Sequence, residues 1–292
     1  MMASKPNVAA NDADRKDATE IVNQLATKEL VFGVVGPVGA GSSTIAYALR
    51  DFLTSSGYDV HVVKARRFIE NFAAERHIEI SKSLKLKQTE DLQDAGDSMR
   101  KALGHSVIAE KFAVEIRDLR AKAVGGDPTS AEPIPPDETP RAYILDSIRH
   151  PSEVALLRKI YQQSFCLIGV VCEESVRLDR LHDKYLDAGR DVIASFMKRD
   201  EKAAEKHGQH VSSAFHLSDF FVENTQPDYI TGPGGVKNSN PAWNVNEDLA
   251  GNYILYLAAR LRHIIGHGHQ HHQPDLPRRS QGDCAPRNLA LA

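Results

Sequence analysis

Two adjoining stretches, Leu30-Val31-Phe32-Gly33-Val34-Val35 and Gly36-Pro37-Val38-Gly39-Ala40-Gly41-Ser42-Ser43, indicate the class of fold. The first is almost continuously apolar, which is typical of a strand buried on both faces of a parallel sheet. The second is a glycine-rich turn, and apolar residues recur at helical spacing in Ile45–Phe52 after it. Another apolar run follows at Val60–Val63. A strand, a glycine-rich turn, a helix and a strand in this order predict the βαβ opening of an α/β fold.

The glycine-rich turn has the spacing of a phosphate-binding loop, G-x-x-x-x-G-K-[ST], except that Ser42 stands in place of the lysine. Glycines let backbone N–H groups turn inward around an anion, and the next helix adds its dipole. Ser42 cannot supply the point charge that a lysine gives to the phosphates. The alternative is a turn that binds nothing. We expect a nucleotide site, for ATP or a deoxynucleoside triphosphate, that includes the following loop residues: Gly36, Gly39, Gly41, Ser42, Ser43 and Thr44.

Asp146 follows a second buried apolar run, Ala142–Leu145. An acid in this position lies at the carboxyl edge of a parallel sheet, where ligands bind. It could hold Mg²⁺ together with Ser43, or act as a base on an acceptor. The alternative is a helix N-cap, because Pro151 suits the first turn of a helix shortly afterwards.

Four arginines, at positions 177, 180, 190 and 199, follow the strand Cys166–Val171, in two predicted helices (Arg177–Asp183 and Val192–Lys206) and in the segment between them. In kinases of small molecules, arginines in this place close over phosphates, because a planar guanidinium pairs with phosphate in a bidentate manner. We expect Arg180 and Arg190 to bind the nucleotide, with Asp187–Asp191 as the tip of the lid. The alternative is a solvated helical face with Arg–Asp pairs at short spacing.

These features predict a three-layer α/β fold of P-loop NTPase type, similar to nucleotide kinases, with a mainly parallel sheet. We expect residues 1–29 to form a tail and a helix, 30–265 the kinase-like domain and 266–292 a histidine-rich disordered tail. Gly125–Pro140, with five prolines, four acids and no base, is expected to be a flexible insert. The expected central strands are Leu30–Val35, Val60–Val63, Ala142–Leu145 and Cys166–Val171, and the last helix is Asn246–Ile265.

Composition excludes several classes of function. The net charge of −3 gives no basic face for duplex nucleic acid. Three cysteines in 292 residues favour a reducing compartment over a disulfide framework. No run approaches the ~18 apolar residues of a membrane span, and no secretory signal is visible, so we expect a soluble, cytoplasmic protein without a membrane partner. The histidines at 267, 269, 271 and 272 lack partner ligands, so we expect no metal site there.

The chain resembles the N-terminal P-loop, kinase-like module of bacterial anti-phage deoxycytidylate (dCTP/dCMP) deaminases. The resemblance rests on Gly36–Gly41, on Ile144-Leu145-Asp146-Ser147-Ile148-Arg149-His150-Pro151-Ser152-Glu153-Val154, and on Asn246-Glu247-Asp248-Leu249-Ala250-Gly251-Asn252-Tyr253. In that family the module is fused to a C-terminal zinc deaminase domain. The resemblance therefore implies a nucleotide-binding regulatory role in antiviral defence.

The deaminase half departs from the family pattern. A zinc deaminase needs H-x-E and P-C-x-x-C, and we expect neither motif in this chain. Cys284 is the only cysteine after Cys172, so two thiolate ligands cannot come from the tail, and zinc is not expected. Three interpretations stay open: a regulatory module that works with a second copy or a separate deaminase chain; a divergent nucleoside or nucleotide kinase with weak kinase or NTPase activity; and a scaffold that binds no ligand.

Overall fold

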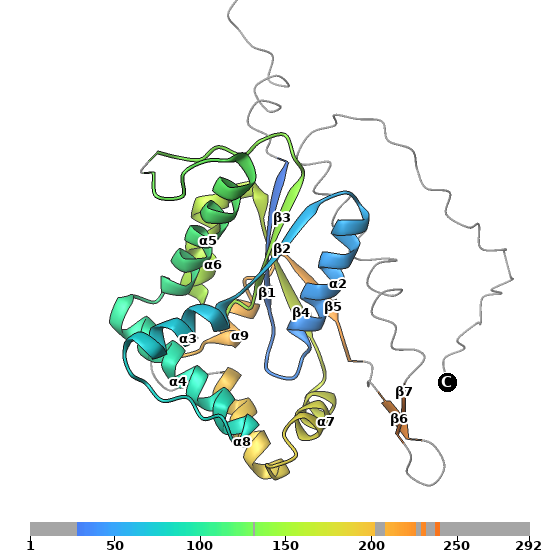
Figure 1. Ribbon diagram of the computed structural model, residues 1–292. Helices are drawn as coiled ribbons and strands as arrows, with labels where there is room; N and C mark the ends of the chain where they lie inside the picture. Colours follow the sequence, from blue (N-terminus) through green and yellow to red (C-terminus); the bar gives the residue numbers. More distant parts are fainter. Residues whose placement is uncertain (1–27, 131, 202–207, 226–228, 232–236, 240–292) are drawn as a thin grey trace, which may run out of the picture.

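The computed structural model describes residues 28–130, 132–201, 208–225, 229–231 and 237–239. Five strands form one parallel sheet in the order β2-β3-β1-β4-β5 (Figure 1). The strands of this sheet are β1 (Glu29–Val35), β2 (Asp59–Lys64), β3 (Arg141–Asp146), β4 (Phe165–Val171) and β5 (Phe220–Glu223). A separate antiparallel pair consists of β6 (Tyr229–Thr231) and β7 (Lys237–Ser239). The predicted α/β fold with a mainly parallel sheet is confirmed.

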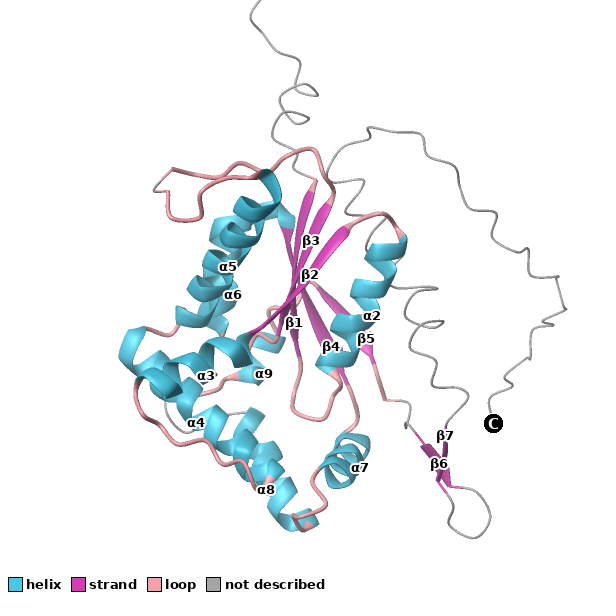
Figure 2. Ribbon diagram, viewed as in Figure 1, coloured by secondary structure: helices cyan, strands magenta, loops and turns pink. Residues whose placement is uncertain are grey.

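Helices cover both faces of the large sheet and make a three-layer arrangement (Figure 2). The helix α2 lies on one face, and α5 and α6 lie on the other. The helical segments are α2 (Ser42–Ser55), α3 (Ala65–Glu75), α4 (Lys85–Leu103), α5 (Val107–Val124), α6 (Pro151–Tyr161), the 3-10 turn η2 (Gln162–Ser164), α7 (Glu174–Lys184), α8 (Arg190–Glu201) and α9 (Val211–Phe215). No helix in these described residues is both long and apolar enough to cross a membrane.

The strands build two cores by alternating their side chains. In β1, Phe32 and Val34 pack with α2, whereas Val31 and Val35 pack with α5 and α6. The same alternation holds in β3 and β4, so the continuous apolar runs in the sequence come from strands buried on both faces. Cys166 and the half-buried Cys172 belong to the α2 side, as the even spacing between them predicts.

A third, smaller core joins α7 and α8 to α4 beyond the carboxyl edge of the sheet (Figure 1). The hydroxyl groups of Tyr185 and Thr89 lie 3.1 Å apart, which adds a polar contact between α4 and the segment after α7. This core consists of Leu86, Leu181, Tyr185, Ile193, Phe196 and Met197. The predicted arginine-bearing helices are therefore present and packed on the body of the protein.

One predicted strand differs in position. Val60–Val63 was expected to be central, but β2 is an edge strand of the described sheet, and most of its residues are only half-buried. The reason is topological: β3 takes the place beside β1, and an apolar run does not reveal the order of strands. Asn246–Ile265, the histidine tract and most of the expected N-terminal tail and helix lie outside the described residues.

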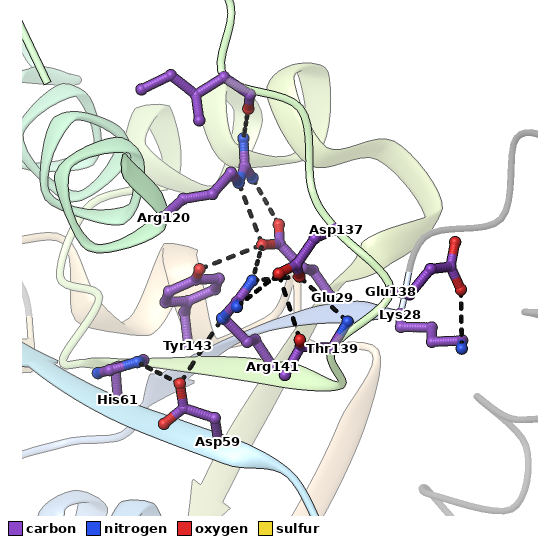
Figure 3. A network of polar contacts seen from close by, with 11 residues as sticks. Lys28, Glu29, Asp59, His61, Arg120, Asp137, Glu138, Thr139, Arg141 and Tyr143 are labelled. Atoms are coloured by element: carbon purple, nitrogen blue, oxygen red, sulfur yellow. Dashed lines mark hydrogen bonds and ion pairs between the residues drawn. The ribbon is translucent and has the colours of Figure 1, made fainter. Parts of the chain in front are cut away.

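A buried polar network closes the amino edge of the sheet (Figure 3). Glu29 at the start of β1 accepts hydrogen bonds from Arg120 of α5, at 2.6 and 3.1 Å, and from the Tyr143 hydroxyl at 3.2 Å. Burial and the neighbouring Glu29 carboxylate raise the pKa of Tyr143. Arg141 pairs with Asp137 at 2.6 Å. These contacts belong to the fold, since they lie at the end of the sheet opposite the glycine-rich loop.

The proline-rich segment after α5 is tied to this network at several described residues. Arg117 donates to the carbonyl oxygens of Pro128 and Ser130, and Arg120 donates to that of Ile134. The flexibility expected for Gly125–Pro140 stays a prediction. In the structure, Arg117 and Arg120 attach this segment to α5.

Candidate functional site

The loop and Asp146 lie at the carboxyl ends of two neighbouring strands whose following helices cover opposite faces of the sheet. The helix α2 follows β1 and covers one face, while α6 follows β3 and covers the other. Because β1 and β3 are neighbours, their carboxyl ends form a topological switch point, where open α/β sheets bind ligands. The five-stranded order together with a phosphate-type loop after the central strand defines a P-loop fold of nucleotide-kinase type.

Two glycines in the loop are required by backbone conformation and by packing. Gly39 and Gly41 have φ values of 84° and 86°, in the left-handed region that favours glycine. A Cβ atom at Gly39 would lie 2.9 Å from the carbonyl oxygen of Arg177, and one at Gly41 would collide with the Asn224 side chain. Gly41 is also the N-cap of α2. The first N–H groups of α2, from Ser42 to Thr44, have no partner within the helix and present positive dipole ends to an anion.

Ser42, at the lysine position, is buried, and its hydroxyl lies 2.8 Å from where a Cβ atom on Gly36 would be. This side chain is short and neutral, so the loop itself carries no full positive charge. Thr44 lies in the first turn of α2 and is half-buried.

Ser43, Asp146 and Lys64 form a compact cluster beside the first turn of α2. The Ser43 hydroxyl donates to Asp146 Oδ2 at 2.8 Å. Lys64 Nζ lies 3.6 Å from the same carboxylate oxygen. The Asp146 side chain is only 6% exposed, whereas that of Lys64 is 42% exposed. The cluster therefore has a buried acid and a partly open cation.

The alternative role of Asp146 as a helix cap is wrong. His150 caps α6, accepting from Ser152 N through Nδ1 at 3.1 Å, and Glu153 completes a capping box. Asp146 instead faces Ser43, as the magnesium interpretation requires. Pro151 opens α6 in its first turn, as the sequence predicts.

Asp200 of α8 binds the backbone of the first half of the loop. Its buried carboxylate accepts the Val38 backbone N–H at 2.8 Å, Arg149 Nη1 at 2.9 Å and Gln93 Nε2 at 3.1 Å. Arg149 also reaches to within 3.5 Å of the Gly36 carbonyl oxygen. The loop is thus fixed by two side chains from distant parts of the chain, Asp200 and Arg149, and Gln93 supports the first of them.

A buried ion pair in turn fixes the segment that carries Arg149. Glu153 accepts from Arg100 at 2.8 and 3.0 Å, and from the backbone N–H groups of Arg149 and His150 at 2.8 and 3.2 Å. Since both Arg100 and Glu153 are buried, the turn between Asp146 and α6 has a rigid support.

The predicted arginines fall into two groups. Arg180 donates to the Asn224 carbonyl oxygen at 3.0 Å, and the Asn224 amide donates to the Ala40 carbonyl oxygen at 2.8 Å, so Arg180 lies one residue removed from the loop. The exposed Arg190 pairs with Asp179 at 2.6 Å, and Arg199 pairs with Asp94. These pairs are exposed, as the alternative of a solvated helical face predicts, but they join residues 11 and 105 positions apart and not at the short spacing of that alternative. Nucleotide binding by Arg180 and Arg190 stays a prediction.

Arg177, the fourth arginine, is buried beside the loop. It pairs with Glu201 at 2.6 Å and its Nη1 lies 3.5 Å from the Val38 carbonyl oxygen. A cavity of about 320 Å³ opens here, lined by Pro37, Val170, Arg177, Val211 and Phe215 among others. This volume lies at the lower end of the range for small-ligand pockets.

The residues that the sequence analysis missed are Lys64, Arg149, Asp200 and Asn224. Lys64 could have been found, because it directly follows the apolar run Val60–Val63, and the same signal identified Asp146. Arg149 lies within the segment that carries the family resemblance. Nothing in the local sequence marks Asp200, which reaches the loop across 162 residues.

The oxygens of Ser43 and Asp146 fit a magnesium ion. A hydroxyl and a carboxylate stand 2.8 Å apart, and Mg²⁺ at phosphate sites takes one or two protein oxygens together with phosphates and water. When bound with a nucleotide, the ion would offset phosphate charge. Within the described residues, no group of three or more His, Cys, Asp or Glu is arranged to hold a metal by itself.

One detail of the sequence requires correction. The triplet H-x-E does occur once, as His77-Ile78-Glu79, directly after α3. No P-C-x-x-C stands anywhere in the chain, so this triplet lacks the two thiolates of a zinc deaminase.

No protein-family model matches the chain. A UPF0200/UPF0201 protein of Archaeoglobus fulgidus is 25% identical over 195 residues, which make up 67% of this chain and 50% of that protein. The chain thus spans about half the length of this curated relative.

Several solved structures are similar to the chain at low sequence identity. A shikimate kinase from Acinetobacter baumannii, in complex with shikimate, is 11% identical with a TM-score of 0.38, covering 82% of this chain and 98% of that one. The Mycobacterium tuberculosis APS kinase CysC, with AMPPNP and APS, is 12% identical with a TM-score of 0.36, covering 80% and 96%. TT1252 from Thermus thermophilus is 16% identical with a TM-score of 0.37, covering 68% and 90%.

Proposed function

We propose that this chain binds a nucleotide, as its magnesium complex, through the loop Gly36–Ser43 and Asp146. The observation that carries the proposal is the 2.8 Å hydrogen bond from Ser43 to Asp146 at the switch point of the sheet. It brings the hydroxyl at the end of the loop and the acid at the end of β3 together at the N-terminus of α2. Helix N–H groups attract phosphate, and the two oxygens suit the accompanying cation.

The biological role that we propose is regulation within a deoxycytidylate deaminase-type defence protein. Its support is the resemblance of the loop and of Ile144–Val154 to the P-loop module of that family. The neutral Ser42 also favours sensing over phosphoryl transfer, because no lysine in the loop stabilises transferred charge. In this role the module binds the nucleotide and acts on a deaminase domain carried by a partner chain.

A divergent nucleoside or nucleotide kinase is the second candidate. One observation favours it: side chains from outside the loop bring positive charge next to it, among them Lys64 and Arg149. Phosphoryl transfer depends on positioning and on such charge more than on covalent chemistry by the protein. Under this reading Asp146 would also orient an acceptor hydroxyl.

Calorimetric titration with ATP, dCTP and dCMP in the presence of Mg²⁺ tests the binding proposal. Asp146→Asn keeps the size of the side chain and an oxygen that accepts from Ser43, but it removes the charge that attracts Mg²⁺. We expect it to weaken binding of the preferred nucleotide by roughly tenfold or more, the size of one lost charge-assisted contact. Asp51→Asn is the matched control, since Asp51 lies on the same helix α2 and forms an exposed pair with its neighbour Arg50.

Product analysis then separates the two roles. A kinase would convert ATP to ADP with a nucleoside or nucleotide acceptor, whereas a regulatory module would bind without turnover. Equal affinities for wild type, Asp146→Asn and Asp51→Asn would show that the loop and Asp146 are not the binding site.

A further inference from the structure

We propose that Lys64, at the end of β2, supplies the positive charge that the phosphate loop lacks at Ser42. The nucleotide phosphates would thus be held from two sides: by backbone N–H groups of the loop and α2, and by an ammonium from the edge strand of the sheet. This inference rests on the proposed nucleotide binding and assigns a phosphate-binding residue to that site.

The position of the Lys64 ammonium supports the proposal. Its Nζ and the Ser43 hydroxyl approach the same oxygen of Asp146, at 3.6 and 2.8 Å. The ammonium therefore lies next to the first turn of α2, whose N–H groups lack partners within the helix.

Both the backbone and the side chain of Lys64 make contacts that position it. Lys64 pairs with Asp146 in the register of β2 and β3, so the two residues end their strands at the same level. The ammonium lies 5.0 Å from the centre of the Tyr47 ring on α2. Although burial alone would lower the pKa of Lys64, contacts with Tyr47 and with the Asp146 carboxylate raise it.

The Lys64 side chain is also partly accessible to a ligand. At 3.6 Å, its contact with Asp146 is longer than a hydrogen bond, and 42% of the side chain remains exposed. A compact ammonium on a flexible stem can follow a phosphate over a short distance.

The arginines nearest to the loop are already committed. Arg149 pairs with the buried Asp200, and Arg177 pairs with Glu201. Removing either guanidinium from its carboxylate would leave a charge without its partner, which is costly for the buried Asp200. If the ammonium moved to a phosphate, the oxygens of Asp146 and Ser43 would be the ones to hold Mg²⁺, and the Asp146 carboxylate would not lack an opposite charge.

The test is calorimetric titration of the full chain with Mg·ATP and Mg·dCTP. The variants are Lys64→Met and Lys64→Arg, and the control is Lys122→Met, an exposed lysine in the last turn of α5 near the opposite edge of the sheet. We expect Lys64→Met to weaken binding roughly 10- to 100-fold, the range for one lost charge-assisted hydrogen bond. Lys64→Arg should retain most of the affinity, and Lys122→Met should bind like wild type.

Moving the charge gives a second readout. In a Ser42→Lys background the loop has its own lysine, so Lys64→Met should cost much less than it does in wild type. An equal loss in both backgrounds would contradict the replacement of one charge by the other. If wild type binds nucleotide and Lys64→Met binds it equally well, this inference is overturned while the proposed function stands. Failure of wild type to bind any of the nucleotides would overturn both.

Discussion

The two ends of the central sheet use charged residues in opposite ways. At the amino edge, Glu29 and Arg141 are each only 4% exposed, and the Glu29 carboxylate contacts Arg120 at 2.6 Å (Figure 3). At the carboxyl edge, the buried Asp146 faces a half-open Lys64 at 3.6 Å. The first arrangement is closed and mutually neutralised, whereas the second leaves a cation accessible to a ligand.

The difference shows how one sheet can separate stability from binding. Buried charges at the amino edge are satisfied by one another, which fixes α5 and the segment before β3 to the start of β1. At the carboxyl edge, the 3.6 Å contact between Asp146 and Lys64 is longer than the 2.6 Å contact between Glu29 and Arg120, so the Lys64 ammonium could exchange its partner for an anion. The presence of an acid and a base does not by itself distinguish a closed structural network from an accessible binding site. The burial of the side chains and the distance between them do.

The largest effect is expected from breaking the amino edge. Glu29→Ala would leave the buried Arg141 and the largely buried Arg120 without their shared carboxylate, so we expect a loss of ~3–5 kcal/mol in the free energy of unfolding. Urea denaturation measures this. Glu138→Ala is the control, because Glu138 is 94% exposed and should change stability by no more than ~0.5 kcal/mol. Similar small losses for both variants would show that the amino edge does not support the fold.

Gly41→Ala should give the next largest effect, this time at the carboxyl edge. Alanine would be strained in this left-handed backbone conformation, and its methyl group would collide with Asn224. We therefore expect a loss of ~1–3 kcal/mol in the free energy of unfolding, measured by urea denaturation. Gly57→Ala separates the two causes, since Gly57 has the same φ of 86° but no heavy atom within 4 Å of the added Cβ. Equal losses at the two glycines would mean that Asn224 moves away at no cost.

Asp146→Asn should have a smaller effect on stability than either change. The Lys64 ammonium that loses its partner is already partly solvated, so we expect the free energy of unfolding to change by less than ~1 kcal/mol. Urea denaturation in the absence of nucleotide measures it. A loss as large as that of Glu29→Ala would mean that the carboxyl edge is structural too, and the contrast between the two ends would fail.

The smallest effect concerns acid stability at the amino edge. Hydrogen bonds from Arg141 lower the pKa of Asp137 from 3.8 to about 2. A lowered pKa in the folded state stabilises the protein above the ordinary pKa, and this stabilisation disappears as the pH falls from about 4 to about 2. Wild type should therefore exceed Asp137→Asn in urea midpoint at pH 6, and the gap should shrink at pH 2.5. A gap that stays constant with pH would rule out this carboxylate as the titrating group.

Much of the architecture could be predicted from local pattern. Continuous apolar runs such as Ala142–Leu145 identified the buried parallel strands, and the spacing from Gly36 to Ser43 identified the loop between β1 and α2. Asp146 followed from the rule that chemistry gathers at the carboxyl ends of parallel strands. These inferences succeed because strand burial and glycine conformation depend on neighbours in the chain.

By itself, then, the sequence determined the α/β fold, the phosphate-type loop and the absence of a lysine from it. Only the tertiary structure decided that β2 stands at the edge, that Lys64 shares Asp146 with Ser43, and that Asp200 and Asn224 hold the loop. These contacts join residues that are 82 to 184 positions apart. They depend on the spatial order of the strands in the sheet and on the face that each connecting helix covers. Hydrophobic periodicity does not encode that order, because every buried strand has the same pattern whichever neighbour it takes.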